Sequence, residues 1–182
     1  METPRVRDIM IPVSEYVVIE DTGVLSDAFV ALEDFCRDKN KRKPHRDVLV
    51  TRDGKVVAKL TMLDVLKALE PRYEHIQPER YQGRTLTAGL VDKLIREFGL
   101  WADPTAALCR KAGSYKIADV MHLPEAAELL DEDDTVEHAL HRYILGVHQP
   151  LLVQRDGEVT GVLRLGDVFD YLKTKITECP AG

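Results

Sequence analysis

The sequence predicts an α+β protein in which two related β-α-β-β-α units share a core and a helical segment is inserted between them. Two internal matches support this prediction. Residues 53–66 (DGKVVAKLTMLDVL) align without a gap with residues 156–169 (DGEVTGVLRLGDVF), 103 positions later. Residues 6–10 (VRDIM) match residues 117–121 (IADVM), 111 positions later. A unit of about 60 residues is only marginally stable alone, so the two copies are expected to pack together.

The longer match describes the closing half of each unit. Its Asp-Gly pair predicts a tight turn, because glycine adopts a positive φ without steric strain. A β-prone run follows as a strand. In the first copy the apolar spacing of Val65, Leu66 and Leu69 then predicts a helix that opens at Asp64.

An amphipathic helix is predicted in the opening half of each unit. Its apolar face consists of four residues in each copy, related by the offset of 111 positions: Leu25, Ala28, Phe29 and Leu32, then Val136, Ala139, Leu140 and Tyr143. Thr22 and Thr135 are the expected N-caps of these helices. The two offsets differ by eight residues, which we assign to a longer polar loop, 36–46, in the first copy.

Each unit therefore has three predicted strands. They cover 16–20, 47–52 and 55–60 in the first copy and 127–131, 150–154 and 158–163 in the second. The whole pattern divides the chain into three predicted parts, which are a first repeat (1–70), a helical insertion (71–116) and a second repeat (117–177).

The insertion has no internal match. After an irregular start (71–78), an apolar stripe within 90–98 predicts a helix that opens near Thr87. Asp103-Pro104 is expected to supply the N-cap and the first residue of a further short helix, which Gly113 would end. The apolar stripe is expected to pack on the repeats, on a second subunit or over a ligand.

Composition narrows the class of protein. With 45% hydrophobic and 31% charged residues, the chain is typical of soluble globular proteins. A net charge of −6 argues against nucleic acid as the main partner, and no apolar run is long enough to span a membrane. The N-terminus lacks the features of a signal peptide. Three widely spaced cysteines argue against a disulfide framework and indicate a reducing, cytoplasmic location.

The repeated motifs resemble those of the CBS domain family, and two copies in tandem resemble its paired arrangement, the Bateman module. The resemblance rests on the openings Asp-Ile-Met (8–10) and Asp-Val-Met (119–121), the amphipathic helices, the Asp-Gly turns and the Ala/Gly-x-x-Thr/Arg-x-x-Asp endings. It implies a pseudo-twofold pair of repeats whose sheets pack together, with two clefts that bind adenine nucleotides. It also implies a homodimer formed through helices of the pair.

Thr61 and Asp64 are the predicted ligand-binding residues of the first repeat. The Asp64 carboxylate can accept hydrogen bonds from both hydroxyls of a ribose, and the Thr61 hydroxyl, with nearby helix amides, can hold a phosphate. The resemblance assigns these roles to the Thr-x-x-Asp positions. The alternative is that Asp64 only caps the following helix.

The second repeat departs from this pattern. Arg164 replaces the small hydroxyl residue, while Asp167 is retained. Arg164 either pairs with a phosphate or fills the cleft and blocks it. We therefore expect two unequal sites, with the better adenosine site at Thr61 and Asp64.

Further residues are placed near the nucleotide by the resemblance. They are Met10 and Met121 in the openings of the repeats, and His45 and Arg46 in front of a strand. The loop around Arg46 is strongly basic and is either solvated or attracts phosphates or an acidic protein surface. Its basic residues are Arg37, Lys39, Lys41, Arg42, Lys43 and Arg46.

The remaining polar motifs predict no catalysis. An acidic run is expected to form a solvated surface: Glu125, Glu128, Asp131, Glu132, Asp133, Asp134 and Glu137. His138 and His141 follow it, but no HExxH or EF-hand spacing is present, so we predict no metal site. No nucleophile motif or phosphate-binding glycine loop occurs. The prediction is a regulatory module that binds AMP, ADP, ATP or a similar ligand; the alternative is a structural or protein-interaction module with empty or blocked clefts.

Overall fold

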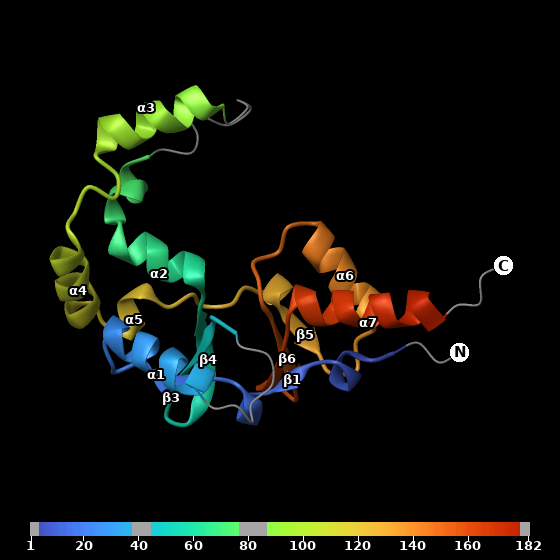
Figure 1. The fold of residues 1–182 in the computed structure, drawn as a ribbon. Coiled ribbons are helices and arrows are strands. Elements are labelled where there is room, and N and C mark those ends of the chain that lie inside the picture. The colour runs from blue at the N-terminus through green and yellow to red at the C-terminus, as the bar shows by residue number, and fades with distance from the viewer. Residues whose placement is uncertain (1–3, 38–44, 77–86, 179–182) are drawn as a thin grey trace.

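The computed structural model describes residues 4–37, 45–76 and 87–178 and confirms the predicted α+β class. Each repeat contains strand, helix, strand, strand and helix in that order (Figure 1). In the first repeat these are β2 (Val18–Glu20), α1 (Leu25–Arg37), β3 (Val48–Arg52), β4 (Lys55–Leu60) and α2 (Met62–Leu69). In the second they are β5 (Leu129–Asp131), α6 (Val136–Ile144), β6 (Leu151–Arg155), β7 (Glu158–Leu163) and α7 (Leu165–Glu178).

The strands form two small sheets of matching topology. One sheet has the order β2-β3-β4, and the other has the order β1-β7-β6-β5, where β1 is a short N-terminal strand (Ile11–Pro12). In each sheet the first strand of the repeat is parallel to the second, and the second and third form an antiparallel hairpin. Both hairpins carry a register shift at the same place, after Val50 and after Val153.

A pseudo-twofold axis relates the two sheets. Residues at equivalent positions of the two repeats touch each other across it. Lys55 and Glu158, in the two hairpin turns, form an ion pair of 2.7 Å. Leu49 and Leu152 belong to the same buried cluster, which lies where the sheets meet. The sheets therefore pack face to face across this shared cluster, which lies between the separate cores of the two repeats.

The opening segment of each repeat packs with the other repeat. Val6 is completely buried in the core of the second repeat, and its N–H donates to the carbonyl of Asp134 at 2.9 Å. Its equivalent, Ile117 at the start of α5 (Ile117–Val120), is completely buried in the core of the first repeat and donates to the carbonyl of Gly23 at 3.0 Å. The packed units therefore exchange their N-terminal segments.

The helix starts differ from two of the predictions. α1 begins at Leu25, where the Asp27 carboxylate accepts from the Val24 N–H at 2.8 Å, so Thr22 lies too early to be the N-cap. The predicted cap Thr135 is confirmed, since its side chain accepts from the backbone N–H of His138. α2 begins at Met62 rather than at Asp64, and Thr61 is its N-cap.

The insertion contains the 3₁₀ helix η3 (Pro71–His75), α3 (Ala88–Phe98) and α4 (Thr105–Ser114). Thr87 caps α3 as predicted. The N-cap of α4 is Pro104 rather than Asp103, because the Asp103 carboxylate is drawn to Lys111 at 2.8 Å. Gly113 lies inside α4 and does not end it.

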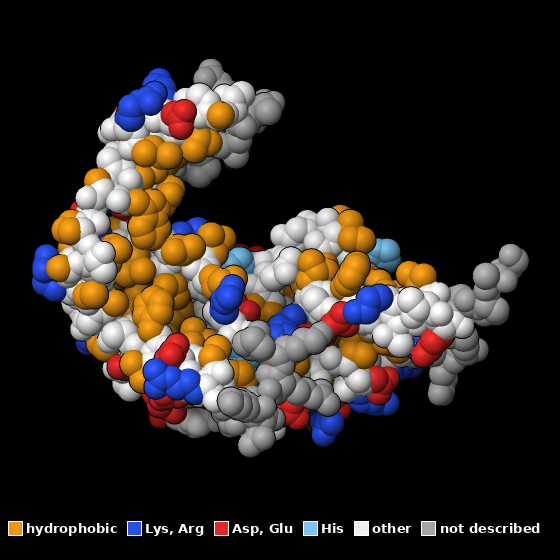
Figure 2. All heavy atoms as spheres, viewed as in Figure 1, with side chains coloured by type: hydrophobic (Ala, Val, Ile, Leu, Met, Phe, Trp, Pro, Cys, Tyr) orange, Lys and Arg blue, Asp and Glu red, His pale blue; other side chains and the backbone are white. Residues whose placement is uncertain are grey.

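The two helices of the insertion are placed differently. α4 packs beside α1 and α2 and contributes Ala112 to the core of the first repeat. α3 stands away from the sheets (Figure 1), and Val91 and Ile95 on its apolar stripe are 40% and 44% exposed. Figure 2 shows hydrophobic side chains along the hollow that lies between α3 and the repeats.

A polar cluster fixes the base of the segment that carries α3. Glu70 is 1% exposed and accepts from the Arg72 guanidinium at 2.5 and 2.7 Å and from the Trp101 N–H at 2.6 Å. Hydrogen bonding to Arg72 is the main cause that lowers the pKa of Glu70.

Among the helices of the described residues, none has the length and apolar character that crossing a membrane requires.

Candidate functional site

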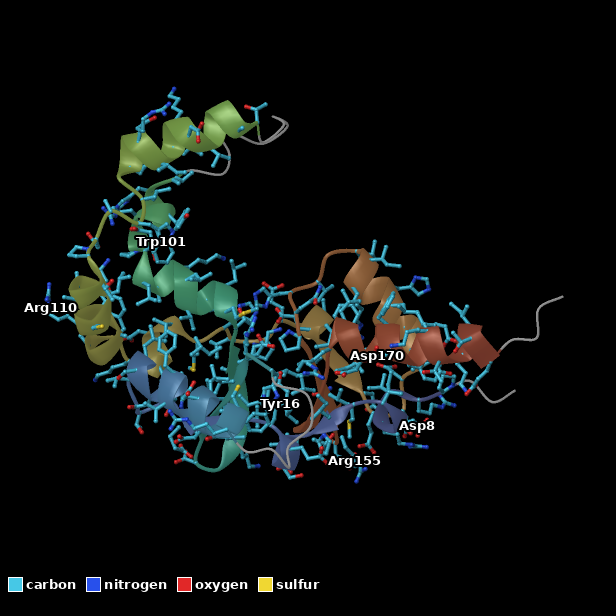
Figure 3. The ribbon with its side chains drawn as sticks, in the orientation of Figure 1. Asp8, Tyr16, Trp101, Arg110, Arg155 and Asp170 are labelled. Atoms are coloured by element: carbon cyan, nitrogen blue, oxygen red, sulfur yellow. The ribbon has the colours of Figure 1, made fainter. Side chains whose placement is uncertain are left out.

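Three clefts lie near the two helices that close the repeats. The central cleft, about 460 Å³, is formed by the first turns of α2 and α7 and by the loop 146–150. The Asp167 cleft, about 680 Å³, lies between α7 and the N-terminal segment that includes Asp8 and Ile9 (Figure 3). The Asp64 cleft, about 170 Å³, lies between α2, η3 and α5.

The Asp167 and Asp64 clefts are equivalent under the pseudo-twofold axis. Asp8 and Ile9 of the larger cleft correspond to Asp119 and Val120 of the smaller one, at the offset of 111 positions. Their volumes differ, and the insertion contributes to this difference because its residue Glu74 lines the Asp64 cleft. Sites for drug-sized ligands typically have volumes of about 300–1,000 Å³. The Asp167 cleft, at about 680 Å³, lies within this range, and the Asp64 cleft, at about 170 Å³, lies below it.

Thr61 and Asp64 form a reciprocal capping box. The Asp64 Oδ2 atom accepts from the Thr61 N–H at 2.9 Å and from its hydroxyl at 2.6 Å, while the Thr61 Oγ1 accepts from the Asp64 N–H at 3.3 Å. Thr61 is 5% exposed and lines the central cleft. One carboxylate oxygen and the hydroxyl are therefore already used by the helix start, and Asp64 Oδ1 is the oxygen that points elsewhere.

Arg164 and Asp167 form a bidentate ion pair. The Arg164 Nε donates to Asp167 Oδ2 at 2.7 Å, and its NH2 group donates to Oδ1 at 2.7 Å. This hydrogen bonding is the main cause that raises the pKa of Arg164. Arg164 lines both the central cleft and the Asp167 cleft. The expected roles of Arg164 were to pair with a phosphate or to block the cleft, whereas in the structure its partner is Asp167.

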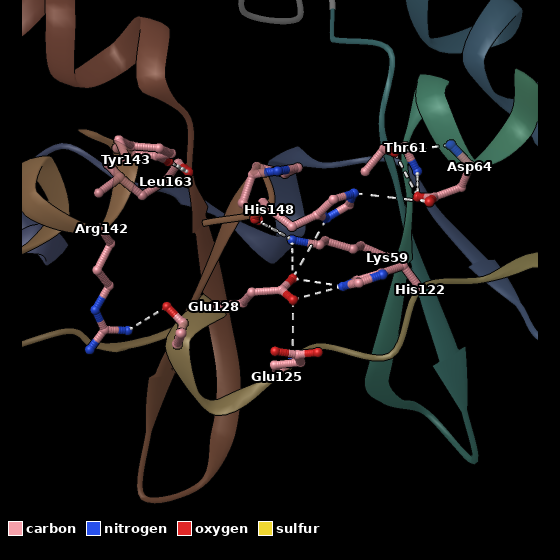
Figure 4. Close-up of polar contacts among 12 residues, drawn as sticks. Lys59, Thr61, Asp64, His122, Glu125, Glu128, Arg142, Tyr143, His148 and Leu163 are labelled. Atoms are coloured by element: carbon pink, nitrogen blue, oxygen red, sulfur yellow. Dashed lines mark hydrogen bonds and ion pairs between the residues drawn. The ribbon is translucent and has the colours of Figure 1, made fainter. Parts of the chain in front are cut away.

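A buried ionic network lies between the repeats, beside the central cleft (Figure 4). Lys59 is completely buried, and its Nζ lies 2.6 Å from Glu128 Oε2, 2.9 Å from the His148 carbonyl and 2.6 Å from the Pro150 carbonyl. Burial lowers the pKa of Lys59. For Glu128, burial acts in the opposite direction, but hydrogen bonds from Lys59 and His122 hold its pKa below the ordinary value. The two groups lie at ion-pair distance, and each provides a hydrogen-bond partner for the other.

Two histidines extend this network. His122 Nε2 lies 2.8 and 2.9 Å from the Glu128 carboxylate oxygens, and the His122 backbone pairs with Lys59. The His148 ring stacks on His122 with 4.1 Å between ring centroids. His148 Nδ1 lies 3.7 Å from Glu128 Oε2, and its Nε2 lies 4.0 Å from Asp64 Oδ1. Burial is the main cause that lowers the pKa of His148.

The other predicted ligand residues lie outside the clefts. His45 is 4% exposed, its Nε2 accepts from the Val17 N–H at 3.2 Å, and its ring stacks on Tyr16 at 3.8 Å. Arg46 is exposed and lines a space of about 10 Å³, which is too small for a ligand. Met10 and Met121 are partly buried against the cores of the second and first repeats, respectively. Of the basic loop, residues 38–44 lie outside the described residues.

The acidic run is not the uniform solvated surface that was expected. Glu128 and Glu132 are 2% and 5% exposed because they face cations of the sheet, namely Lys59 and Arg155. The run also contributes to the surface, where Asp134 lies 3.2 Å from His138. Burial alternates along this segment because it passes from η5 (Ala126–Glu128) into β5.

Residues 117–174 match the family model of the CBS domain. The chain contains a CBS domain. The matched segment is the second repeat, and the structure extends the likeness to the whole chain, which has the fold of a CBS pair. A CBS-pair protein from Arabidopsis thaliana, CBSX2, is 18% identical with a TM-score of 0.58 over 98% of this chain and 100% of its own. The sequence-based assignment to tandem CBS proteins is confirmed.

Two similar CBS structures contain nucleotides. One is CBSX2 in complex with AMP, which is 18% identical with a TM-score of 0.58 and covers 93% of this chain and 97% of its own. The other is the CBS domain of a bacterial CNNM/CorC family Mg²⁺ transporter in complex with ATP, 18% identical with a TM-score of 0.57 over 93% of this chain and 87% of its own. No curated protein matches the chain in sequence.

Proposed function

We propose that the protein is a non-catalytic regulatory module that binds an adenosine-containing ligand, such as AMP, ADP or ATP, in the Asp167 cleft. The observation that carries the proposal is that this cleft combines a volume of about 680 Å³ with apolar, acidic and basic side chains. Similar CBS structures in complex with AMP and with ATP support this ligand class.

The cleft offers a partner for each part of such a ligand. Ile9, Ile11 and Tyr171 supply apolar surface for a base. Asp167 can accept hydrogen bonds from ribose hydroxyls, and Arg164 can donate to a phosphate. Binding would then replace the Arg164–Asp167 ion pair by two new contacts, so neither charge would be left without a partner.

This proposal reverses the expected order of the two sites. The Asp64 cleft, which the sequence favoured, measures about 170 Å³. Asp64 Oδ2 is also held by Thr61, so the bidentate contact with a ribose that the sequence suggested would have to displace the capping box.

Equilibrium titration of the full chain with adenosine, AMP, ADP and ATP tests the proposal, with guanine nucleotides as controls for base selectivity. We expect saturable binding of at least one adenine compound. Folded protein that binds none of them would refute the proposal.

The Arg164–Asp167 pair also favours a second candidate function, in which the clefts stay empty because these two side chains satisfy each other, and the protein is an interaction module. Thermal unfolding distinguishes the two, because a ligand that binds the native state raises the melting temperature. A nucleotide-dependent rise supports the sensor, and its absence across the nucleotide series supports the interaction module.

Replacing Arg164 with alanine should weaken ATP binding by about tenfold, which corresponds to about 1.4 kcal/mol, and should affect adenosine much less. The expected loss is modest because the guanidinium must leave Asp167 before it binds a phosphate. Added salt should narrow the difference between ATP and adenosine, since screening weakens the phosphate contact. Equal losses for both ligands, independent of salt, would contradict a phosphate role.

We also expect a homodimer. α2 and α7 present exposed apolar side chains at equivalent positions: Met62 and Leu66 (50% and 46% exposed) correspond to Leu165 and Phe169 (41% and 65% exposed). Such a two-part apolar surface is suited to a self-complementary interface. Light scattering at micromolar concentration should give a dimer mass, and Phe169→Glu should shift it towards the monomer. A monomeric wild-type protein would contradict this expectation.

A further inference from the structure

We propose that Asp64, His122 and His148 form a binding site for a divalent transition-metal ion of the zinc class. One ligand atom from each of the three side chains lies within 4.8 Å of the other two. They come from three separate elements, namely the first turn of α2, the segment after α5 and the loop before β6 (Figure 4). Sequence motifs could not reveal this site, because its residues are far apart along the chain.

The orientation of the two rings supports this assignment. A histidine that ligates a metal almost always directs its other ring nitrogen to a carboxylate, a carbonyl or water, which fixes the tautomer. Glu128 occupies this position for His122, at 2.8 Å from Nε2, whereas His148 Nδ1 lies 3.7 Å from Glu128 Oε2, beyond hydrogen-bond distance. His148 Nδ1 is buried and has no hydrogen-bond partner among the described residues. The remaining ring nitrogens are His148 Nε2, 4.0 Å from Asp64 Oδ1, and His122 Nδ1.

The positive charge of the buried Lys59 ammonium is compensated by the Glu128 carboxylate, 2.6 Å away. Its three contacts lie at the Glu128 carboxylate and at the carbonyls of His148 and Pro150, so its protons are already directed to acceptors. Lys59 and Glu128 neutralise each other. Asp64 then supplies the net negative charge that faces the ion.

The pseudo-twofold symmetry provides an internal comparison. The positions related by it to Lys59, His122 and Glu128 are occupied by the apolar residues Val162, Ile11 and Val17. Apolar residues in place of a buried ion pair are often as stable or more stable. Stability alone therefore does not explain why Lys59, His122 and Glu128 form a buried polar network. A role in holding imidazoles in position for a metal ion does explain it.

The pseudo-symmetric counterpart of this site lacks the complete ligand set. Asp167 and His45 correspond to Asp64 and His148, but Ile11 replaces the second imidazole. His45 Nε2 already accepts a backbone hydrogen bond, and both oxygens of Asp167 pair with Arg164. We therefore infer one site per chain.

The ligands select the type of metal. Two imidazoles and one carboxylate suit zinc and related ions, whereas magnesium and calcium prefer oxygen ligands. Donor atoms around tetrahedral zinc lie roughly 3.3–3.5 Å apart, so the side chains would close by rotation from their present spacing. His148 also lines the central cleft, which leaves the fourth position accessible to water or a small ligand.

The test is a titration of the untagged full chain with Zn²⁺ alone, in competition with a chromophoric chelator and without nucleotide. We expect one zinc ion per chain. His148→Ala, His122→Asn and Asp64→Asn should each lower the affinity by at least tenfold, and Glu128→Gln by about 10–100-fold. His138→Ala is the matched control, because His138 is an exposed histidine beside an aspartate and should bind zinc like the wild type.

Cobalt identifies the ligands independently. Co²⁺ at the same site should give the absorption of a nitrogen and oxygen environment, without a thiolate charge-transfer band from the exposed Cys36 or Cys109. The proposal is overturned if zinc does not bind stoichiometrically, if folded His148→Ala and His122→Asn both keep wild-type affinity, or if His138→Ala loses as much. Because no nucleotide is added, none of these results depends on whether the Asp167 cleft binds adenosine.

Discussion

Replacing Lys59 with valine should destabilise the protein by about 3–5 kcal/mol. The substitution leaves the Glu128 carboxylate, whose side chain is 3% exposed, without its ammonium partner. It also removes the donor to the carbonyls of His148 and Pro150. Urea unfolding followed by circular dichroism measures the loss as a lower midpoint at an unchanged slope.

The double variant Lys59→Val/Glu128→Val is the decisive control. It introduces the residue type found at the pseudo-symmetric equivalents of both positions, Val162 in the second repeat and Val17 in the first. Because apolar residues of similar volume often replace a buried ion pair at little loss, the double variant should recover most of the stability. Adding His122→Ile gives the third position of the network the residue type of its pseudo-symmetric equivalent, Ile11. It also removes a histidine that would have lost its acidic partner. If the double variant is as unstable as the sum of its single variants, the ion pair is not the source of the loss.

Replacing Asp167 with asparagine should weaken the binding of adenine nucleotides by roughly tenfold to a hundredfold. Hydrogen bonds to a charged group contribute about 1.5–3 kcal/mol, and each 1.4 kcal/mol is a factor of ten in affinity. Asp64→Asn should bind nucleotide almost like the wild type, because its cleft is about 170 Å³.

Asparagine is the appropriate substitution at both positions, because it keeps the shape of the side chain and an oxygen acceptor at the third helix position while removing the charge. Thermal unfolding of both variants must accompany the titration, since Asp167→Asn also leaves Arg164 without its charged partner. A larger loss of affinity in Asp64→Asn than in Asp167→Asn would restore the order of sites that the sequence suggested.

The fold was predictable because its main signals are local and occur twice. The turns at Asp53 and Asp156 both adopt a positive φ of 52°, followed by glycine, and the hairpin β3–β4 recurs as β6–β7. The helix starts were less certain, because threonine and aspartate are both good caps and three residues separate them. Only the structure shows that Thr61 takes the N-cap position and Asp64 the third position of the helix.

The polar part of the site was predictable only where its partners are close in sequence. Arg164 and Asp167 lie three residues apart at a helix start, and this spacing was a signal for their ion pair that the sequence analysis did not use. The contact between Lys59 and Glu128 has no such signal. It depends on how the two sheets meet, and composition alone made Glu128 look like one residue of a solvated acidic run.

The exchange of opening segments determines how the protein can assemble. A nascent chain that has emerged as far as α2 still lacks Ile117, which fills the core around Leu25. The second core likewise needs Val6, from the opening segment of the first repeat. Neither repeat is thus a complete folding unit, and the two cores close through contacts between residues 94 positions apart (Gly23 and Ile117) and 128 positions apart (Val6 and Asp134). Such long-range closure slows folding and makes unfolding a single cooperative event for the two cores.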